Sequence, residues 1–88
     1  MYYVYVLRSD KDGKFYIGQT NNLENRMWRH KSGYIVSTKN RRPLKLVFYE
    51  EYPNRSQAMR REKFLKSGEG HKIIYQRFVD AARETGSE

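Results

Sequence analysis

The stretch Phe15–His30, FYIGQTNNLENRMWRH, decides the fold because a strand end and a helix start meet in it. Its YIG tripeptide at 16–18 is typical of the end of a strand. Asn21, followed three residues later by Glu24, predicts a capping box, so a helix should begin at about Asn22. A strand, a glycine and a helix therefore follow one another in this one stretch.

The predicted helix carries a cation and a titratable ring beside an apolar stripe. At about 100° per residue, Leu23, Met27 and His30 share one face, and Arg26 lies at its edge within one turn of His30. A functional site is expected here. Considered singly, His30 could also be a satisfied core histidine and Arg26 a solvated surface cation.

The length of 88 residues allows one domain with one modest core, which we predict over residues 1–84, with 85–88 as a frayed tail. Eight tyrosines and four phenylalanines indicate a core rich in aromatic side chains. The chain has no cysteine, which excludes a disulfide framework and a thiolate metal site. Since no stretch resembles a signal peptide or a membrane span, we expect a cytoplasmic protein.

Three strands and two further helices are predicted outside the first helix. The first strand is apolar or aromatic on both faces, so it should be central in a small sheet and pair with the second as a hairpin. The second helix should begin with a cap at Asn54 or at Ser56 and end before Gly68 and Gly70. The third helix should begin after these two glycines. The predicted elements are strands at 2–8, 14–18 and 44–52, a polar loop at 34–43, and helices at 22–31, from 54 to about 67, and at 73–83.

Positive charge is concentrated in one part of the chain. The net charge is +8, and the segment from Arg26 to Tyr49 holds seven basic residues and no acidic one. Aromatic residues interleave with these cations, which favours a nucleic-acid partner over a basic surface that only maintains solubility. No helix has the clean basic face of a membrane-surface binder. The cations expected to bind phosphates are Arg29, Lys31, Lys39, Arg41, Arg42 and Lys45, and the interleaved aromatic residues are Trp28, Tyr34 and Tyr49.

Glu62 is a carboxylate on the apolar face of the second predicted helix. On a helical wheel it falls beside Ala58 and Leu65. A buried carboxylate is costly unless it is paired or binds a metal ion. An internal salt bridge, for example to Arg26, and a metal-ligand role both remain open at this point.

Five elements of the sequence, in this order, resemble the GIY-YIG nuclease family: Tyr3-Val4-Tyr5, Tyr16-Ile17-Gly18, Arg26, His30 and Glu62. The resemblance covers residues 2 to about 70 and is strongest to small stand-alone bacterial members, with more distant similarity to the nuclease domain of the incising subunit in excision repair of DNA. It implies an α+β fold, a three-stranded antiparallel sheet flanked by three helices. It also implies a metal-dependent endonuclease that hydrolyses DNA phosphodiester bonds.

The resemblance also implies a role for each site residue. Glu62 would be the only protein ligand of one Mg²⁺ or Mn²⁺ ion, and Arg26 would bind the scissile phosphate. Tyr5 would take a proton from the attacking water, with Tyr16 and His30 positioning water or leaving group. Gly18, expected where the second strand meets the following loop, would leave the backbone open to a docking molecule or would be needed only for the turn. Since a free tyrosine has a pKa near 10, Tyr5 acts as a base only if the positive site lowers that pKa, and His30 is the rival base.

The remaining sequence bounds the substrate. It contains no base-reading module, so we expect action on branched, flapped or nicked DNA, or targeting by a protein partner, rather than sequence-specific cutting. No small-molecule cofactor is expected. Gln19 stands where some family members carry a lysine, which leaves open a nucleic-acid-binding module with little catalysis or a subunit that works only with a partner.

Overall fold

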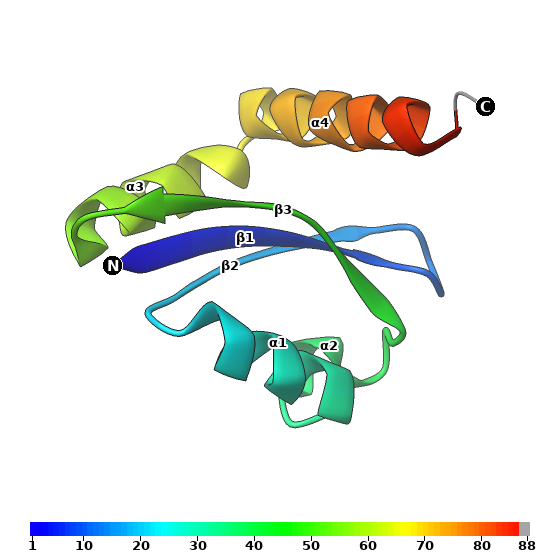
Figure 1. The fold of residues 1–88 in the computed structure, drawn as a ribbon, viewed down its shortest axis with the longest axis horizontal. Helices are drawn as coiled ribbons and strands as arrows, with labels where there is room; N and C mark the ends of the chain where they lie inside the picture. The colour runs from blue at the N-terminus through cyan, green and yellow to red at the C-terminus, as the bar shows by residue number, and fades with distance from the viewer. Residues whose placement is uncertain (87–88) are drawn as a thin grey trace.

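The computed structural model describes residues 1–86 and shows a three-stranded antiparallel sheet between two layers of helices (Figure 1). The strand order is β2-β1-β3, so the first strand is central, as its sequence predicts. The predicted α+β class and three-stranded antiparallel sheet are confirmed. The strands are β1 (Tyr2–Ser9), β2 (Phe15–Thr20) and β3 (Leu44–Tyr52), and the helices are α1 (Leu23–Ser32), α2 (Val36–Lys39), α3 (Arg55–Leu65) and α4 (Gly68–Gly86).

The alternation of β1 divides the protein into its core and its candidate site. Val4 and Val6 are 0% exposed and pack with Leu65 of α3 and Ile74 of α4 in the main hydrophobic core. Tyr5 points to the opposite face, which α1 and α2 cover (Figure 1). Successive strand residues face opposite sides of the sheet. Since helices cover each side, both faces of the central strand are buried (Figure 1). The site is therefore built on the sheet face away from the main core.

The register of the sheet brings residues far apart in sequence to one place. Tyr5 pairs with Gly18 across β1 and β2 and with Tyr49 across β1 and β3. Leu7 pairs with Tyr16 on the same face. Residues directly opposite each other in an antiparallel pair share a face. This register places both tyrosines of the predicted site under α1.

The helix caps correct one boundary prediction and decide another. The side chain of Asn22, not Asn21, caps α1 by accepting a hydrogen bond of 3.0 Å from the backbone N–H of Asn25. The predicted Asn21–Glu24 capping box is therefore wrong. Of the two caps considered for α3, Asn54 is the one that forms, accepting from the backbone N–H of Gln57 at 2.9 Å.

The structure adds one helix and lengthens another. The predicted polar loop at 34–43 contains the four-residue helix α2, so four helices flank the sheet rather than three. Helix α4 begins at Gly68 instead of Ile73, because Ser67 Oγ accepts a hydrogen bond of 3.2 Å from the N–H of Gly70 and caps it. Of the expected frayed tail, residues 85–86 belong to α4, and 87–88 lie outside the described residues.

A carboxylate on the core face ties the sheet to both helices above it. Glu50 accepts hydrogen bonds of 2.9 and 3.1 Å from Arg61 of α3 and one of 2.8 Å from the hydroxyl of Tyr52, and its Oε2 lies 3.6 Å from Nη1 of Arg77 of α4. Burial acts to raise the pKa of Glu50, but these partners outweigh burial and lower it. No helix in residues 1–86 is long and apolar enough to cross a membrane.

Candidate active site

A chain of hydrogen bonds between three buried side chains connects β1, α1 and α2. The hydroxyl of Tyr5 lies 2.9 Å from Nε2 of His30, and Nδ1 of His30 lies 2.7 Å from Oγ1 of Thr38. The Thr38 hydroxyl donates to the carbonyl of Ile35 at 3.5 Å, so its oxygen accepts from Nδ1–H. This assignment leaves Nε2 as the acceptor of the Tyr5 O–H. His30 is thereby oriented with its free lone pair toward Tyr5.

Burial sets the protonation states of this pair. Burial, with a further contribution from the charge of Arg26, lowers the pKa of His30 to about 4. Burial also raises the pKa of Tyr5 above its ordinary value; Tyr16 and Glu62 add to the rise, and Arg26 opposes it. The expectation that the positive surroundings lower the pKa of Tyr5 is therefore wrong, because burial outweighs Arg26. At neutral pH the pair is a protonated phenol beside a neutral imidazole.

Gly18 provides the space that the Tyr5 ring occupies. A Cβ at position 18 would lie 2.6 Å from Cζ of Tyr5 and would also collide with its hydroxyl oxygen. Real Cβ atoms do not approach other atoms this closely. The glycine is therefore required by the tyrosine opposite it in the sheet, and a turn is not the reason for it.

Tyr16 completes a cluster of three rings. Its ring centroid lies 5.3 Å from that of His30 and 6.4 Å from that of Tyr5. Tyr16 is partly exposed, whereas the Tyr5 side chain is only 1% exposed. Of the two tyrosines, Tyr16 is therefore the one that solvent reaches.

Arg26 lies beside this cluster in a cleft of about 210 Å³ that Gln19 and Arg55 also line. Its charge acts on the pKa of both Tyr5 and His30, which places the guanidinium near the pair. Within residues 1–86 it forms no ion pair, so its charge is available to an anion. Arg55 was not predicted as part of the site, since nothing in its local sequence links it to Arg26.

Glu62 offers carboxylate oxygens near the same site, since its charge acts on the pKa of Tyr5. Its Oε2 pairs with Nζ of Lys66 at 3.0 Å, one turn further along α3, so the salt bridge considered from the sequence forms with Lys66 and not with Arg26. Its Oε1 has no hydrogen-bond partner among the described residues, and the side chain is 21% exposed. A single partly exposed carboxylate suits a hard divalent cation that keeps most of its waters. Residues 1–86 contain no cluster of three or more His, Cys, Asp or Glu side chains that could hold a metal ion by themselves.

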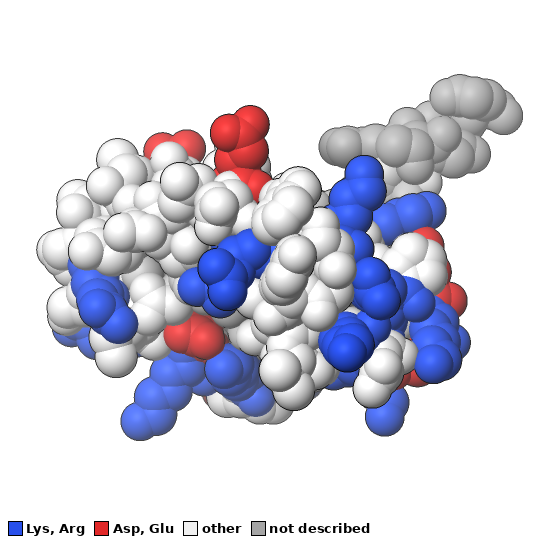
Figure 2. All heavy atoms as spheres, turned by 90° about the horizontal axis from the view of Figure 1, so that it is seen from below, with Lys and Arg blue, Asp and Glu red and all other residues white. Residues whose placement is uncertain are grey.

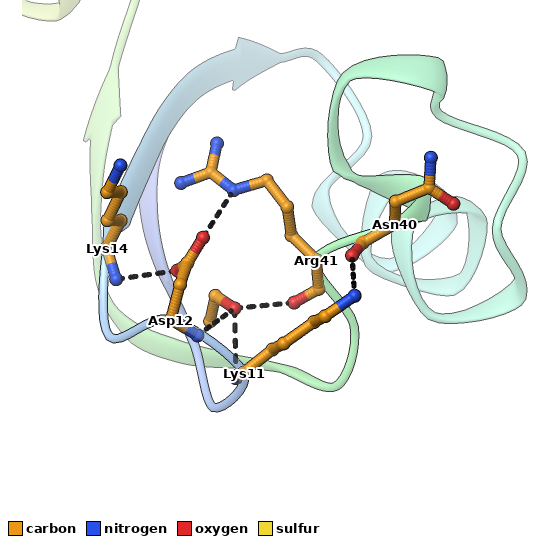
Figure 3. Close-up of polar contacts among 6 residues, drawn as sticks. Lys11, Asp12, Lys14, Asn40 and Arg41 are labelled. Carbon is orange, nitrogen blue, oxygen red and sulfur yellow. Dashed lines mark hydrogen bonds and ion pairs between the residues drawn. The ribbon is translucent and has the colours of Figure 1, made fainter.

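Two of the six cations expected to bind phosphates are paired with carboxylates in the folded chain. Arg41 Nε lies 3.4 Å from Asp12 Oδ2, and Nζ of Lys45 lies 3.5 Å from Asp10 Oδ2. Figure 3 shows Arg41 and Asp12 within a network in which Ser9 Oγ also donates to the Arg41 carbonyl at 2.6 Å. This network joins the turn between β1 and β2 to the segment before β3. Arg41 therefore joins two loops, whereas Lys45, on β3, remains 76% exposed beside Asp10.

The other four cations keep an unneutralised charge. Arg42 is held by two carbonyl oxygens, those of Lys39 at 2.9 Å and Lys31 at 3.2 Å. Arg29, Lys31 and Lys39 are exposed and form no ion pair within the described part of the chain. Viewed from the side of α1 and α2, basic side chains gather toward the end of the molecule where the β1–β2 hairpin lies (Figure 2).

The interleaved aromatic residues have separate environments. Trp28 and Tyr34 stack on each other with ring centroids 5.4 Å apart and an interplanar angle of 23°, and they are 56% and 64% exposed. Tyr49 instead packs edge-on against Tyr3, with centroids 6.0 Å apart. Tyr49 is 45% exposed, so all three aromatic residues predicted to stack on bases keep exposed surface.

Comparison with known proteins gives consistent matches. A family model described as the GIY-YIG catalytic domain matches residues 1–73, which include all five residues of the candidate site. The UPF0213 proteins CPE1444 of Clostridium perfringens and SH2523 of Staphylococcus haemolyticus are 43% and 42% identical over 67 residues, covering 75% of this chain and 71% and 80% of theirs. The solution NMR structure of UPF0213 protein BH0048 from Bacillus halodurans is similar with a TM-score of 0.53 at 34% identity, covering 86% of this chain and 84% of that one.

Proposed function

This chain belongs to the GIY-YIG family of nucleases, and we propose that it is an endonuclease that hydrolyses DNA phosphodiester bonds with one divalent metal ion. The observation that carries the proposal is the 2.9 Å contact between the Tyr5 hydroxyl and neutral His30, beside the unpaired guanidinium of Arg26. Hydrolysis of a phosphodiester needs a proton acceptor for water and a cation for the phosphate. Arg26 and His30 provide these two groups from positions four residues apart, about one turn, on α1.

In this proposal Tyr5 and His30 act together as the base. Tyr5 takes a proton from the attacking water at its hydroxyl oxygen and passes its own proton to Nε2 of His30. No free phenolate is needed, so the raised pKa of Tyr5 is no obstacle. A phosphate bound to Arg26 would offset the positive charge that helps burial to lower the pKa of His30, so substrate binding would strengthen this base.

Arg26 and Glu62 act on the phosphate. Arg26 would bond the non-bridging oxygens, whose negative charge grows as the water attacks. Glu62 would hold Mg²⁺ or Mn²⁺ at its free Oε1, and such an ion supplies further charge stabilisation at the phosphate. Tyr16, at the open side of the ring cluster, would orient the water or the leaving group, and cleavage would leave a 5′-phosphate.

The substrate is proposed to be DNA recognised by its structure. The nuclease domain uses most of the chain, since the family match covers residues 1–73. Exposed charged and aromatic side chains such as Arg29 and Trp28 can bind phosphates and stack on unpaired bases whatever the base sequence. Branched, flapped or nicked DNA, or delivery by a protein partner, fits these surfaces.

A second candidate function is a binding module that has kept the fold and lost most of its catalysis. The observation that favours it is the 1% exposure of Tyr5, which leaves the hydroxyl little access to water. Gln19, beside Arg26, is also a weaker electrostatic partner than a lysine for any developing negative charge.

A cleavage assay separates the two. Purified protein is incubated with linear, nicked, flapped and branched DNAs in Mg²⁺, Mn²⁺ or EDTA, next to Arg26→Ala and the exposed-surface control Arg60→Ala. The nuclease proposal requires metal-dependent cleavage that Arg26→Ala loses and Arg60→Ala keeps. DNA binding without cleavage by the unmodified protein under all conditions supports the binding module instead.

A further inference from the structure

A second cavity lies on the other flank of His30, away from Arg26. It has a volume of about 810 Å³ and is bounded by α1, the segment between α2 and β3, and the sheet. On α1, Arg26 precedes His30 by about 40° of rotation, whereas Lys31 follows it by about 100°. The cavity on the Lys31 side is therefore distinct from the cleft at Arg26, although His30 lines it.

Among the described residues, four cations and no carboxylate line this cavity; the cations are Lys11, Lys31, Lys39 and Arg42. Lys11 Nζ donates to the carbonyl of Asn40 at 3.0 Å, and Arg42 donates to two further carbonyls. Carbonyl acceptors hold these groups in position without cancelling their charge. An anion with several oxygen atoms, such as a phosphate, is the ligand that this arrangement suits.

Apolar side chains line the cavity between these cations. Leu7 is buried, Leu46 is 42% exposed, and Met27 and Leu44 complete this surface. A flat apolar group next to phosphate oxygens is the chemistry of a nucleotide. In a duplex the bases are stacked inside the helix and cannot enter a cavity, so the nucleotide must be unpaired.

The outer surface of α1 connects the two sites. Arg29, Trp28 and Lys31 follow one another around the helix from the side of Arg26 to the side of the cavity. Trp28 carries the stacked ring of Tyr34, and both are exposed. A helix is about 10–12 Å across with its side chains, so a few nucleotides would span this surface. It offers cations for phosphates and an aromatic face for bases.

We propose that this cavity binds an unpaired nucleotide of the DNA substrate and that the preceding unpaired nucleotides cross α1 over Trp28 and Tyr34. The inference rests on the proposed nuclease function, because it defines the substrate of that site as DNA with a single-stranded segment next to the bond to be cut. A free mononucleotide has the same chemistry and is distinguished below.

The test is binding in EDTA, where metal-dependent cleavage cannot occur. Fluorescein-labelled hairpin DNA is compared with the same hairpin carrying a short single-stranded flap, by fluorescence anisotropy. Two variants, Lys39→Ala at the cavity and Tyr34→Ala on α1, are each matched by a control on α4, Lys72→Ala and Tyr75→Ala. The fluorescence of Trp28, the one tryptophan in the chain, reports base stacking directly.

The inference requires the unmodified protein to bind the flapped hairpin about tenfold more tightly than the hairpin without a flap. Lys39→Ala and Tyr34→Ala should each reduce this preference several-fold, the controls should keep it, and the flapped DNA alone should quench Trp28. Equal affinity for the two hairpins overturns the inference, as does an equal loss in variants and controls. Deoxyadenosine monophosphate binding as tightly as the flap would also overturn it, in favour of a free-nucleotide site.

Failure of this inference and failure of the nuclease proposal are distinguishable. If the protein cleaves DNA in Mg²⁺ but binds both hairpins equally, the nuclease proposal stands and the proposal that the cavity binds an unpaired nucleotide is wrong. A flap preference that depends on Lys39 and Tyr34, without cleavage, leaves the cavity assignment and removes the nuclease.

Discussion

Tyr5 and Gly18 are direct partners across β1 and β2, and the ring of Tyr5 fills the space where a side chain at position 18 would lie. The tyrosine hydroxyl can reach His30 only because its sheet partner is a glycine. The first tyrosine triplet and the YIG tripeptide thus form one structural unit, although a loop separates them in the sequence.

Gly18→Ala should therefore displace Tyr5. The added Cβ would lie 2.6 Å from Cζ of Tyr5, so we expect a loss of about 1–3 kcal/mol in the free energy of unfolding and a loss of cleavage. Gly68→Ala is the matched control, because no described atom outside its chain neighbours and its own helix backbone lies within 4 Å of a Cβ built there. Urea denaturation of both variants measures the difference. Equal stability of the two would show that the Tyr5 ring is not held against Gly18.

Thr38→Val should disturb the orientation of His30 without changing the shape of the side chain. The substitution removes the oxygen that lies 2.7 Å from Nδ1 and leaves a buried imidazole N–H without a partner. A stability loss of about 1–3 kcal/mol is expected. The cleavage rate should fall at least tenfold, with its pH profile shifted, and Thr38→Ser should restore both. A cleavage rate and pH profile equal to those of the unmodified protein would remove Thr38 from its positioning role.

Acid should weaken the fold through His30. A free histidine has a pKa of about 6.5, and in the folded protein burial lowers that of His30 to about 4. Between these values the unfolded chain binds a proton that the folded chain does not. The stabilisation that comes from keeping His30 neutral should therefore be complete above pH 6.5. The free energy of unfolding should fall by about 3 kcal/mol as the pH drops toward 4.

Chemical denaturation at a series of pH values tests this linkage. The loss in this range should be smaller in His30→Gln than in the unmodified protein, because the titrating group is gone. An identical pH dependence in both proteins would show that His30 is not held in its neutral form by the fold.

Glu50→Gln should separate stability from catalysis. Glu50 is 18% exposed, accepts two hydrogen bonds from Arg61 and lies on the core face, away from Tyr5. Loss of its charge should cost about 1–3 kcal/mol in unfolding free energy and leave the cleavage rate unchanged under native conditions. The exposed neighbour Glu51→Gln should change neither quantity. A large loss of cleavage in folded Glu50→Gln would connect this network to the active site.

The sheet could be predicted from the sequence because its signals are local. The alternation of β1 and the polar turn after it determine a hairpin without long-range information, and the third strand contains an uninterrupted apolar and aromatic run at 46–49. The cap of α1 was misassigned by one residue because Asn21 and Asn22 are both good N-caps. Ser67 was a signal for the start of α4, but Gly68 and Gly70 suggested a break. Gly70 is needed there because α4 begins in close contact with the end of α3.

The site was only partly accessible to sequence reasoning. The residues Tyr5, Arg26 and Glu62 could be selected by their order along the chain. The partner of His30 could not, since Thr38 lies on a four-residue helix that begins without a side-chain cap and has no periodic signal. Arg41 is paired with Asp12, whereas Lys39 forms no ion pair among the described residues. This difference depends on which carboxylate the folded hairpin brings near each cation, and composition carries no information about that.

The most direct test of the account is single-turnover cleavage of a flapped DNA by the unmodified protein, Glu62→Gln and Glu69→Gln, with DNA binding measured in parallel. Glu62→Gln keeps the size of the side chain and removes its charge, and the exposed Glu69 is the matched control on α4. We predict Mg²⁺- or Mn²⁺-dependent cleavage that falls at least a hundredfold in Glu62→Gln, on the order of 3 kcal/mol, and persists in Glu69→Gln, with DNA binding retained in all three. No cleavage by the bound, unmodified protein in either metal, or equal rates for Glu62→Gln and the unmodified protein, would contradict the account.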